Sequence, residues 1–310
     1  KGDLQLLNTL TPAGSVTPNI YNFRVLDEII ISAELYGAGG ASGSGMITRY
    51  WPYEPSVSSD HTETNEEEYY RTNNKTAVID STASEQDSNY TSAATVADTN
   101  YYEGYGGVAK GKLTLTPGKV YKLYIGQTGQ INATSTFGGG STEIRVPDSN
   151  GNEVTALIAG GGGSASLRKI GSSPNFTYTY LSPGGHGGFG TSGNGSDGVQ
   201  GFREDLGNTP INPGKGATTT ANGSAPTALH ANDLTAGLTD QYRQGEGGSG
   251  RFDGSAGLAN NGSPEAQRGA SGGGGGSSFG DPAYVSEISY QGTPLNAQER
   301  GKLIIKTVDD

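Results

Sequence analysis

The sequence predicts an all-β protein in which short strands alternate with glycine-rich tracts. Apolar residues recur at every second position in several short segments, and β-branched residues are frequent in the same segments. The glycine content is also unusual, because 53 of 310 residues are glycine, about 17% against an average near 7%. Since only 32% of the residues are hydrophobic, an apolar core can order only part of the chain.

The first predicted strands lie in residues 20–36, IYNFRVLDEIIISAELY. From Ile29 to Leu35 apolar side chains alternate with Ser32 and Glu34, so one face of the second strand is expected to be buried. The β-branched run and the period of two disfavour a helix. Further strands are expected in residues 283–290 and, as a closing strand, in residues 301–308.

Two hairpins are predicted in the middle of the chain. In residues 111–126 the turn is Pro117-Gly118, because proline presets its φ and glycine accepts a positive φ in the next position. In residues 141–160 the turn contains Asn150-Gly151, a strong hairpin signal. The second turn resembles the start of a calcium loop, but its glycine is one position early and the distal glutamate is missing, so no metal is assigned.

Glycine tracts separate these strands, and two interpretations are open. They are flexible linkers, or they are polyproline II helices that pack closely because no side chains intervene. In the packed form each backbone N–H and C=O needs a partner on a neighbouring tract. We favour packing, because the tracts alternate with strands. The tracts are residues 138–140, 160–163, 184–190, 245–250 and 272–276.

The order of these motifs resembles that of the glycine-rich domain family, found in phage tail-fibre adhesins and bacterial surface proteins, with a related module in the anaplastic lymphoma kinase receptor. The resemblance covers about residues 18–48 and 104–308 and implies a jelly-roll-like β-sandwich carrying a bundle of polyglycine II helices. The motifs are IYNFRV, EIIISAELYGAGGASGSG, GGVAKGKLTLTPGKVYKLYIGQTG, FGGGSTEIRV, ALIAGGGGSAS, GGHGGFGTSGNGSDG, GGGGGSSF and GKLIIKTV.

The chain departs from this family at two places. Residues 1–17 extend beyond the first family strand, and residues 49–103 form an acidic, tyrosine-rich insertion. We expect residues 18–310 to form a single domain around that insertion. Residues 1–17 are a candidate donor strand for the sheet of a neighbouring copy, with Leu4, Leu6 and Leu7 as its assembly residues.

Composition excludes several classes of function. Without cysteine, thiol chemistry and disulfides are excluded, and a net charge of −11 argues against nucleic-acid binding. Three scattered histidines, His61, His186 and His230, do not suggest a catalytic triad. His186 lies among glycines, so we expect its ring to stack on a glycine segment rather than to act as a catalytic base. We therefore expect no enzyme, no cofactor and no metal.

The insertion supplies the candidate binding residues. Its acidic residues number eleven between positions 54 and 103, against Arg71 and Lys75. It is either a solvated loop or an exposed contact surface, since aromatic side chains supply contact area at a small entropic cost. The candidates are Trp51, Tyr53, Tyr69, Tyr70, Tyr101 and Tyr102. Candidate glycosylation sites are Asn74, Asn89, Asn132, Asn175, Asn194 and Asn222.

These features favour a non-enzymatic protein of the cell surface or virion surface. The chain begins at Lys1 rather than Met and has no apolar run of membrane-spanning length, so we expect a secreted, mature protein without a membrane span. The first hypothesis is a structural subunit that assembles with copies of itself into a filament or layer. The alternative is an adhesin or tail-fibre tip that binds a host glycan or surface protein.

Overall fold

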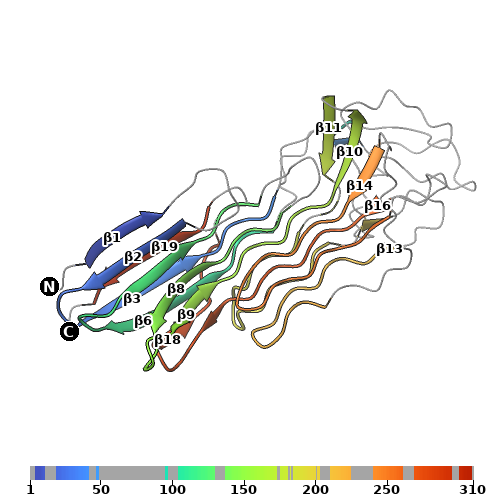
Figure 1. The fold of residues 1–310 in the computed structure, drawn as a ribbon. Coiled ribbons are helices and arrows are strands. Elements are labelled where there is room, and N and C mark those ends of the chain that lie inside the picture. Colours follow the sequence, from blue (N-terminus) through green and yellow to red (C-terminus); the bar gives the residue numbers. More distant parts are fainter. Residues whose placement is uncertain are drawn as a thin grey trace, which may run out of the picture.

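The computed structural model of the chain consists of strands joined by glycine-rich segments (Figure 1). Its described residues contain no helix, and therefore no helix that could span a membrane. The all-β expectation is confirmed for these residues. They are 4–10, 19–41, 47–48, 95–96, 104–129, 137–172, 175–180, 182, 184–199, 201–202, 210–224, 240–260, 269–294 and 300–308.

Two antiparallel sheets lie at one end of the molecule (Figure 1). The larger has the order β1 (Leu4–Leu10), β2 (Asn19–Val25), β7 (Tyr121–Ile125), β8 (Thr142–Pro147), β9 (Glu153–Ala159) and β17 (Phe279–Gly280). The smaller has the order β18 (Val285–Ser289), β6 (Val108–Leu115), β3 (Ile29–Tyr36) and β19 (Lys302–Thr307). The strands predicted in residues 20–36, 283–290 and 301–308 are confirmed.

The two sheets pack face to face through one apolar core. Along β3, Ile31, Ala33 and Leu35 are completely buried, as the alternation of the sequence predicts. Ile144 of β8 and Leu157 of β9 belong to the same buried cluster. Burying one such large side chain contributes about 1.5–3 kcal/mol. The architecture of this part is therefore consistent with a β-sandwich.

One predicted hairpin is confirmed and the other is wrong. β8 and β9 pair across the turn at Gly151, whose φ is 82°. β6 and β7 also flank a turn, at Pro117-Gly118, but they lie in different sheets. This turn leads from one sheet to the other, because β6 pairs with β3 and β18 while β7 pairs with β2 and β8.

Several short strands were not predicted from the sequence. At the far end of the molecule, three form a small sheet in the order β11 (Asn175–Tyr180), β10 (Leu167–Ser172) and β14 (Asp240–Arg243) (Figure 1). The other pairs are β12 (Gly201–Phe202) with β13 (Pro210–Ile211), β15 (Ala259–Asn260) with β16 (Gly269–Ala270), and β4 (Ile47–Thr48) with β5 (Thr95–Val96).

Glycine-rich segments continue from the sandwich as long undulating traces that lie side by side (Figure 1). Backbone hydrogen bonds connect them into a set that we call the glycine array. Its central glycines, in residues 160–163 and 272–276, are fully enclosed by the other segments and buried. The array consists of residues 37–41, 104–107, 126–129, 137–140, 160–166, 184–188, 193–199, 214–217, 245–258 and 271–278.

The hydrogen bonds of segment 271–278 repeat every three residues. Its N–H groups donate in turn to three antiparallel neighbouring segments, so that each neighbour accepts a hydrogen bond from every third residue. Its carbonyls accept from three further neighbours, in residues 185–188, 214–217 and 245–251. Six segments therefore surround it. The carbonyls of residues 193–199 accept hydrogen bonds from the N–H groups of Gly272, Gly275 and Ser278. Those of residues 161–164 accept from Gly273 and Gly276, and those of residues 252–258 accept from Ser271, Gly274 and Ser277.

Candidate assembly surface

The predicted assembly residues Leu4, Leu6 and Leu7 lie in β1, the first strand of the larger sheet. β1 pairs antiparallel with β2 of its own chain, with Leu4 opposite Val25 and Leu6 opposite Phe23. The register shifts between Leu6 and Asn8, which interrupts the ladder at Leu7. The other side of β1 pairs with no strand of the described residues, so among these residues β1 is an edge strand.

The four strands that end the two sheets differ in how their edges are protected. β17 has only two residues, and β18 is irregular around Glu287, whose φ is 52°. β19 carries Lys302 and Lys306 at exposed positions. Short strands, bulges and lysines hinder pairing between edge strands of different chains. β1 has seven residues, LQLLNTL, and none is charged, so the register shift at Leu7 is the one protection of this kind that it carries.

The open strand lies at the end of the sandwich away from the small distal sheet. β1 begins and β19 ends at the pole of the sandwich opposite the glycine array (Figure 1). A second copy that paired along β1 would meet the sandwich rather than the array. This position makes the edge of β1 the candidate assembly surface.

The candidate binding residues Trp51, Tyr53, Tyr69, Tyr70, Tyr101 and Tyr102 lie outside the described residues. The structure does describe the base of their insertion. Ile47 pairs with Val96 and Thr48 with Thr95, so the chain leaves and returns at one place. The insertion therefore has a closed base in β4 and β5.

The candidate glycosylation sites are described only in part. Asn74, Asn89 and Asn132 lie outside the described residues, and Asn175 begins β11. Asn194 and Asn222 are exposed. Their side-chain oxygens accept hydrogen bonds from the N–H groups of Thr219, at 3.0 Å, and Asp253, at 2.9 Å. These two amides thus connect neighbouring segments on the surface of the molecule.

His186 packs among aromatic side chains. Its ring stacks on that of Tyr105 at 4.9 Å and 7°, and Phe189 approaches edge-on at 5.9 Å. The stacking partner is therefore the Tyr105 ring rather than a glycine segment. His186 Nδ1 accepts the N–H of Tyr105 at 3.0 Å, which requires a neutral ring, and burial lowers the pKa of the imidazole.

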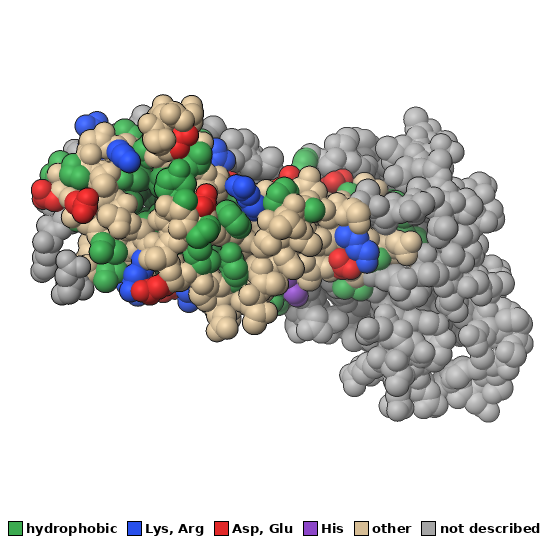
Figure 2. Space-filling model, turned by 90° about the horizontal axis from the view of Figure 1, so that it is seen from below, with side chains coloured by type: hydrophobic (Ala, Val, Ile, Leu, Met, Phe, Trp, Pro, Cys, Tyr) green, Lys and Arg blue, Asp and Glu red, His purple; other side chains and the backbone are tan. Residues whose placement is uncertain are grey.

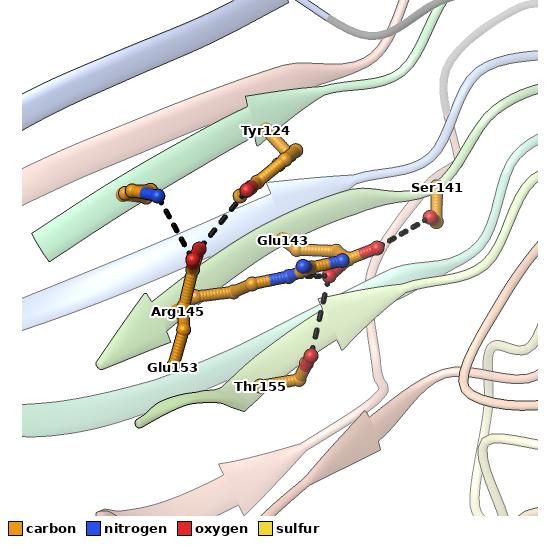
Figure 3. Close-up of polar contacts among 7 residues, drawn as sticks. Tyr124, Ser141, Glu143, Arg145, Glu153 and Thr155 are labelled. Carbon is orange, nitrogen blue, oxygen red and sulfur yellow. Dashed lines mark hydrogen bonds and ion pairs between the residues drawn. The ribbon is translucent and has the colours of Figure 1, made fainter. Parts of the chain in front are cut away.

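A polar cluster on the outer face of the larger sheet was not singled out from the sequence. Glu143 accepts hydrogen bonds from Ser141, Arg145 and Thr155, at 3.0, 2.7 and 3.3 Å (Figure 3). The Arg145 guanidinium also lies 4.2 Å from the centroid of the Tyr124 ring. Glu143 and Arg145 alternate with the buried Ile144, so the period of two was the available signal.

A second carboxylate, Glu153, completes the cluster. It accepts hydrogen bonds from Lys122 Nζ at 2.8 Å and from the Tyr124 hydroxyl at 2.9 Å. Burial raises the pKa of the Glu153 carboxyl, but these two hydrogen bonds together lower it below its ordinary value. Lys122 and Tyr124 lie in β7 and Glu153 lies in β9, so these two contacts reach over the intervening strand β8. Charges of both signs are likewise interspersed over the face drawn in Figure 2.

The chain matches no protein-family model, and no curated protein matches it. Its function must therefore be argued from the geometry above.

Proposed function

We propose that this chain is a non-enzymatic structural subunit that assembles with copies of itself into an extracellular filament or layer. The observation that carries the proposal is β1, an uncharged seven-residue edge strand. Composition supports an extracellular location, because a chain without cysteine needs no reducing compartment. Packing and hydrogen bonds, rather than disulfides, stabilise its fold. The glycine array then serves as a stiff spacer between the sandwich and the far end.

We further propose that the segments of the array are polyglycine II helices and that the sandwich is of the jelly-roll-like, glycine-rich domain type. Polyproline II geometry has three residues per turn and no internal hydrogen bonds. The three-residue repeat of donors along segment 271–278 supports this geometry, as do the six surrounding segments. The order of motifs in the sequence supports the family.

In the proposed assembly, β1, which pairs with β2 alone, leaves its own sheet and pairs with β2 of the next copy in the register that it has within its own chain. The same backbone hydrogen bonds then form between two chains, so the exchange costs little apart from association entropy. The register shift at Leu7 leaves the ladder interrupted. This interruption favours release of β1.

Introduced cysteines test the exchange, because the natural chain has none. Gln5 lies opposite Arg24, whereas Thr9 lies opposite Tyr21, about 10 Å further along the strand. A chain with Gln5→Cys is mixed with a chain carrying Arg24→Cys, assembled and oxidised. We expect disulfide-linked pairs of chains, and far fewer when Thr9→Cys replaces Gln5→Cys.

The two cysteines placed in one chain provide the converse test. In Gln5→Cys/Arg24→Cys an internal disulfide fixes β1 on its own sheet, so oxidised subunits should stay monomeric and reduction should restore assembly. Deleting residues 1–17 should also prevent filaments in electron micrographs while the circular dichroism of the strands persists. Filaments from the deleted or the oxidised chain would reject the mechanism.

The closed base of the insertion favours a second candidate function, an adhesin for a host glycan or surface protein. β4 and β5 hold both ends of the insertion at one place, which suits presentation of a contact surface. Replacing residues 49–94 with a short glycine-serine segment, together with Tyr101→Ser and Tyr102→Ser, should then abolish cell binding without preventing assembly. Unchanged cell binding would remove this candidate.

A further inference from the structure

An open hollow of about 350 Å³ lies where the glycine array meets the outer face of the larger sheet. Glu143, Arg145 and Thr155 of the sheet line one side, and Arg251 and Phe252 of the array line the other. Its size is at the lower end of the range of about 300–1,000 Å³ for small-molecule sites. Glu143, Arg145 and Thr155 belong to the polar cluster of Figure 3.

The array side of the hollow is held by backbone hydrogen bonds. The N–H of Arg251 donates to the carbonyl of Ser277 at 3.0 Å, and the N–H of Phe252 donates to Ser277 Oγ at 3.1 Å. Asp253 Oδ1 accepts the N–H of Gly250 at 3.0 Å. The turn that carries Arg251 is therefore fixed before any ligand binds, which lowers the entropic cost of binding.

Two guanidinium groups at this hollow retain donors. Arg145 uses its Nε for Glu143, and its terminal nitrogens bond to no described residue. The Arg251 guanidinium lies 4.8 Å from the centroid of the Phe279 ring and takes part in no ion pair with a described residue. Arginine presents several N–H donors in a planar fork that matches a carboxylate. The lining carries two positive charges and the one negative charge of Glu143.

The hollow also offers acceptors for hydroxyl groups. Glu143 accepts three hydrogen bonds of the roughly four that a carboxylate can accept, and Thr155 carries a hydroxyl. A ligand that fits has a carboxylate for the arginines and hydroxyl donors beside it. A uronic acid has both on one ring, whereas the side chain of an acidic peptide has a carboxylate without neighbouring hydroxyls.

We propose that this hollow binds a uronic acid unit of an acidic polysaccharide, with its carboxylate on Arg145 and Arg251 and its hydroxyls toward Glu143 and Thr155. This site is independent of the β1 exchange. It would attach an assembled layer to an acidic polysaccharide. Because the whole chain has a net charge of −11, binding depends on these local donors rather than on the overall field.

Calorimetric titration of the full chain with a short oligogalacturonate tests the proposal, and the methyl ester of the same oligosaccharide is the matched ligand. We expect the acid to bind and the ester not to bind. Arg251→Gln should weaken binding about tenfold, the effect of losing one charge-assisted contact. Lys215→Gln, which removes the same charge where it pairs with Asp197, should leave binding unchanged.

Four results would overturn the proposal: no binding of the acid, equal binding of the ester, full affinity in Arg251→Gln, or equally tight binding of polyglutamate of matched charge. The last result would mean that the hollow recognises charge alone. Arg145→Lys gives a second measurement, because it keeps the charge beside Glu143 but loses the planar fork. It should weaken binding while the melting temperature stays within a few degrees of the parent.

Discussion

A β-carbon added inside the glycine array should destabilise the whole molecule. On Gly274 it would lie within 3.0 Å of the carbonyl of Lys215, and on Gly162 within 3.0 Å of the carbonyl of Gly104, distances that real β-carbons essentially never show. The atoms that obstruct it are backbone atoms, which cannot rotate away as a side chain can. The segments must therefore separate.

The magnitude for Gly274→Val follows from the contacts that separation breaks. Overpacking costs about 1–3 kcal/mol. The hydrogen bonds at risk are Gly274 N–H to Ser255 O, Gly248 N–H to Gly274 O and Ser255 N–H to Lys215 O, at 2.8, 2.9 and 3.0 Å. Each contributes about 1 kcal/mol, so the expected loss is about 2 kcal/mol if one bond breaks and up to about 6 kcal/mol if all three break. The melting temperature should fall by at least about 3 °C for a chain of this length.

Scanning calorimetry of Gly274→Val, Gly162→Val and a control measures this effect. Gly118→Ala is the control, because its φ of 79° disfavours a side chain while nothing lies within 4 Å of the new β-carbon. This variant should be destabilised only by the backbone strain of its new side chain, about 1–2 kcal/mol. If Gly274→Val melts with the parent, or no lower than Gly118→Ala, the glycines are not required by close packing and the reasoning fails.

Three further predictions concern single residues. Burial lowers the pKa of His186 in the folded protein. The contribution of this residue to stability is therefore complete above the unfolded pKa of about 6.5 and is lost as the pH falls through the folded pKa. Melting temperatures measured against pH should show this loss, and His186→Gln should remove the pH dependence. Glu287 has a φ of 52°, so Glu287→Gly should be about 1 kcal/mol more stable than Glu287→Ala in urea unfolding, and the reverse order would contradict the strain. Buried Ser278 bridges two glycine backbone groups, so Ser278→Ala should cost about 1–3 kcal/mol in the same assay, whereas Ser192→Ala on the exposed surface should cost little.

The sequence by itself determined most of the strands in the sandwich and, for β3, which face is buried. Alternation from Ile29 to Leu35 predicts β3 correctly, since a strand turns successive side chains to opposite faces. Asn150-Gly151 predicts the β8–β9 hairpin, because that turn needs a residue with positive φ. Both signals are local, and local signals do not depend on distant partners.

Only the tertiary structure decided which segments are neighbours. Pro117-Gly118 predicts a turn but not that its two strands enter different sheets, because turn chemistry does not select the strand that pairs next. The sequence of segment 271–278 likewise does not predict that it forms hydrogen bonds with residues 193–199 and 161–164. Glycines carry no side chains whose pattern could encode a partner. Their neighbours are set by backbone hydrogen bonds and close approach, which exist only once the chain has folded.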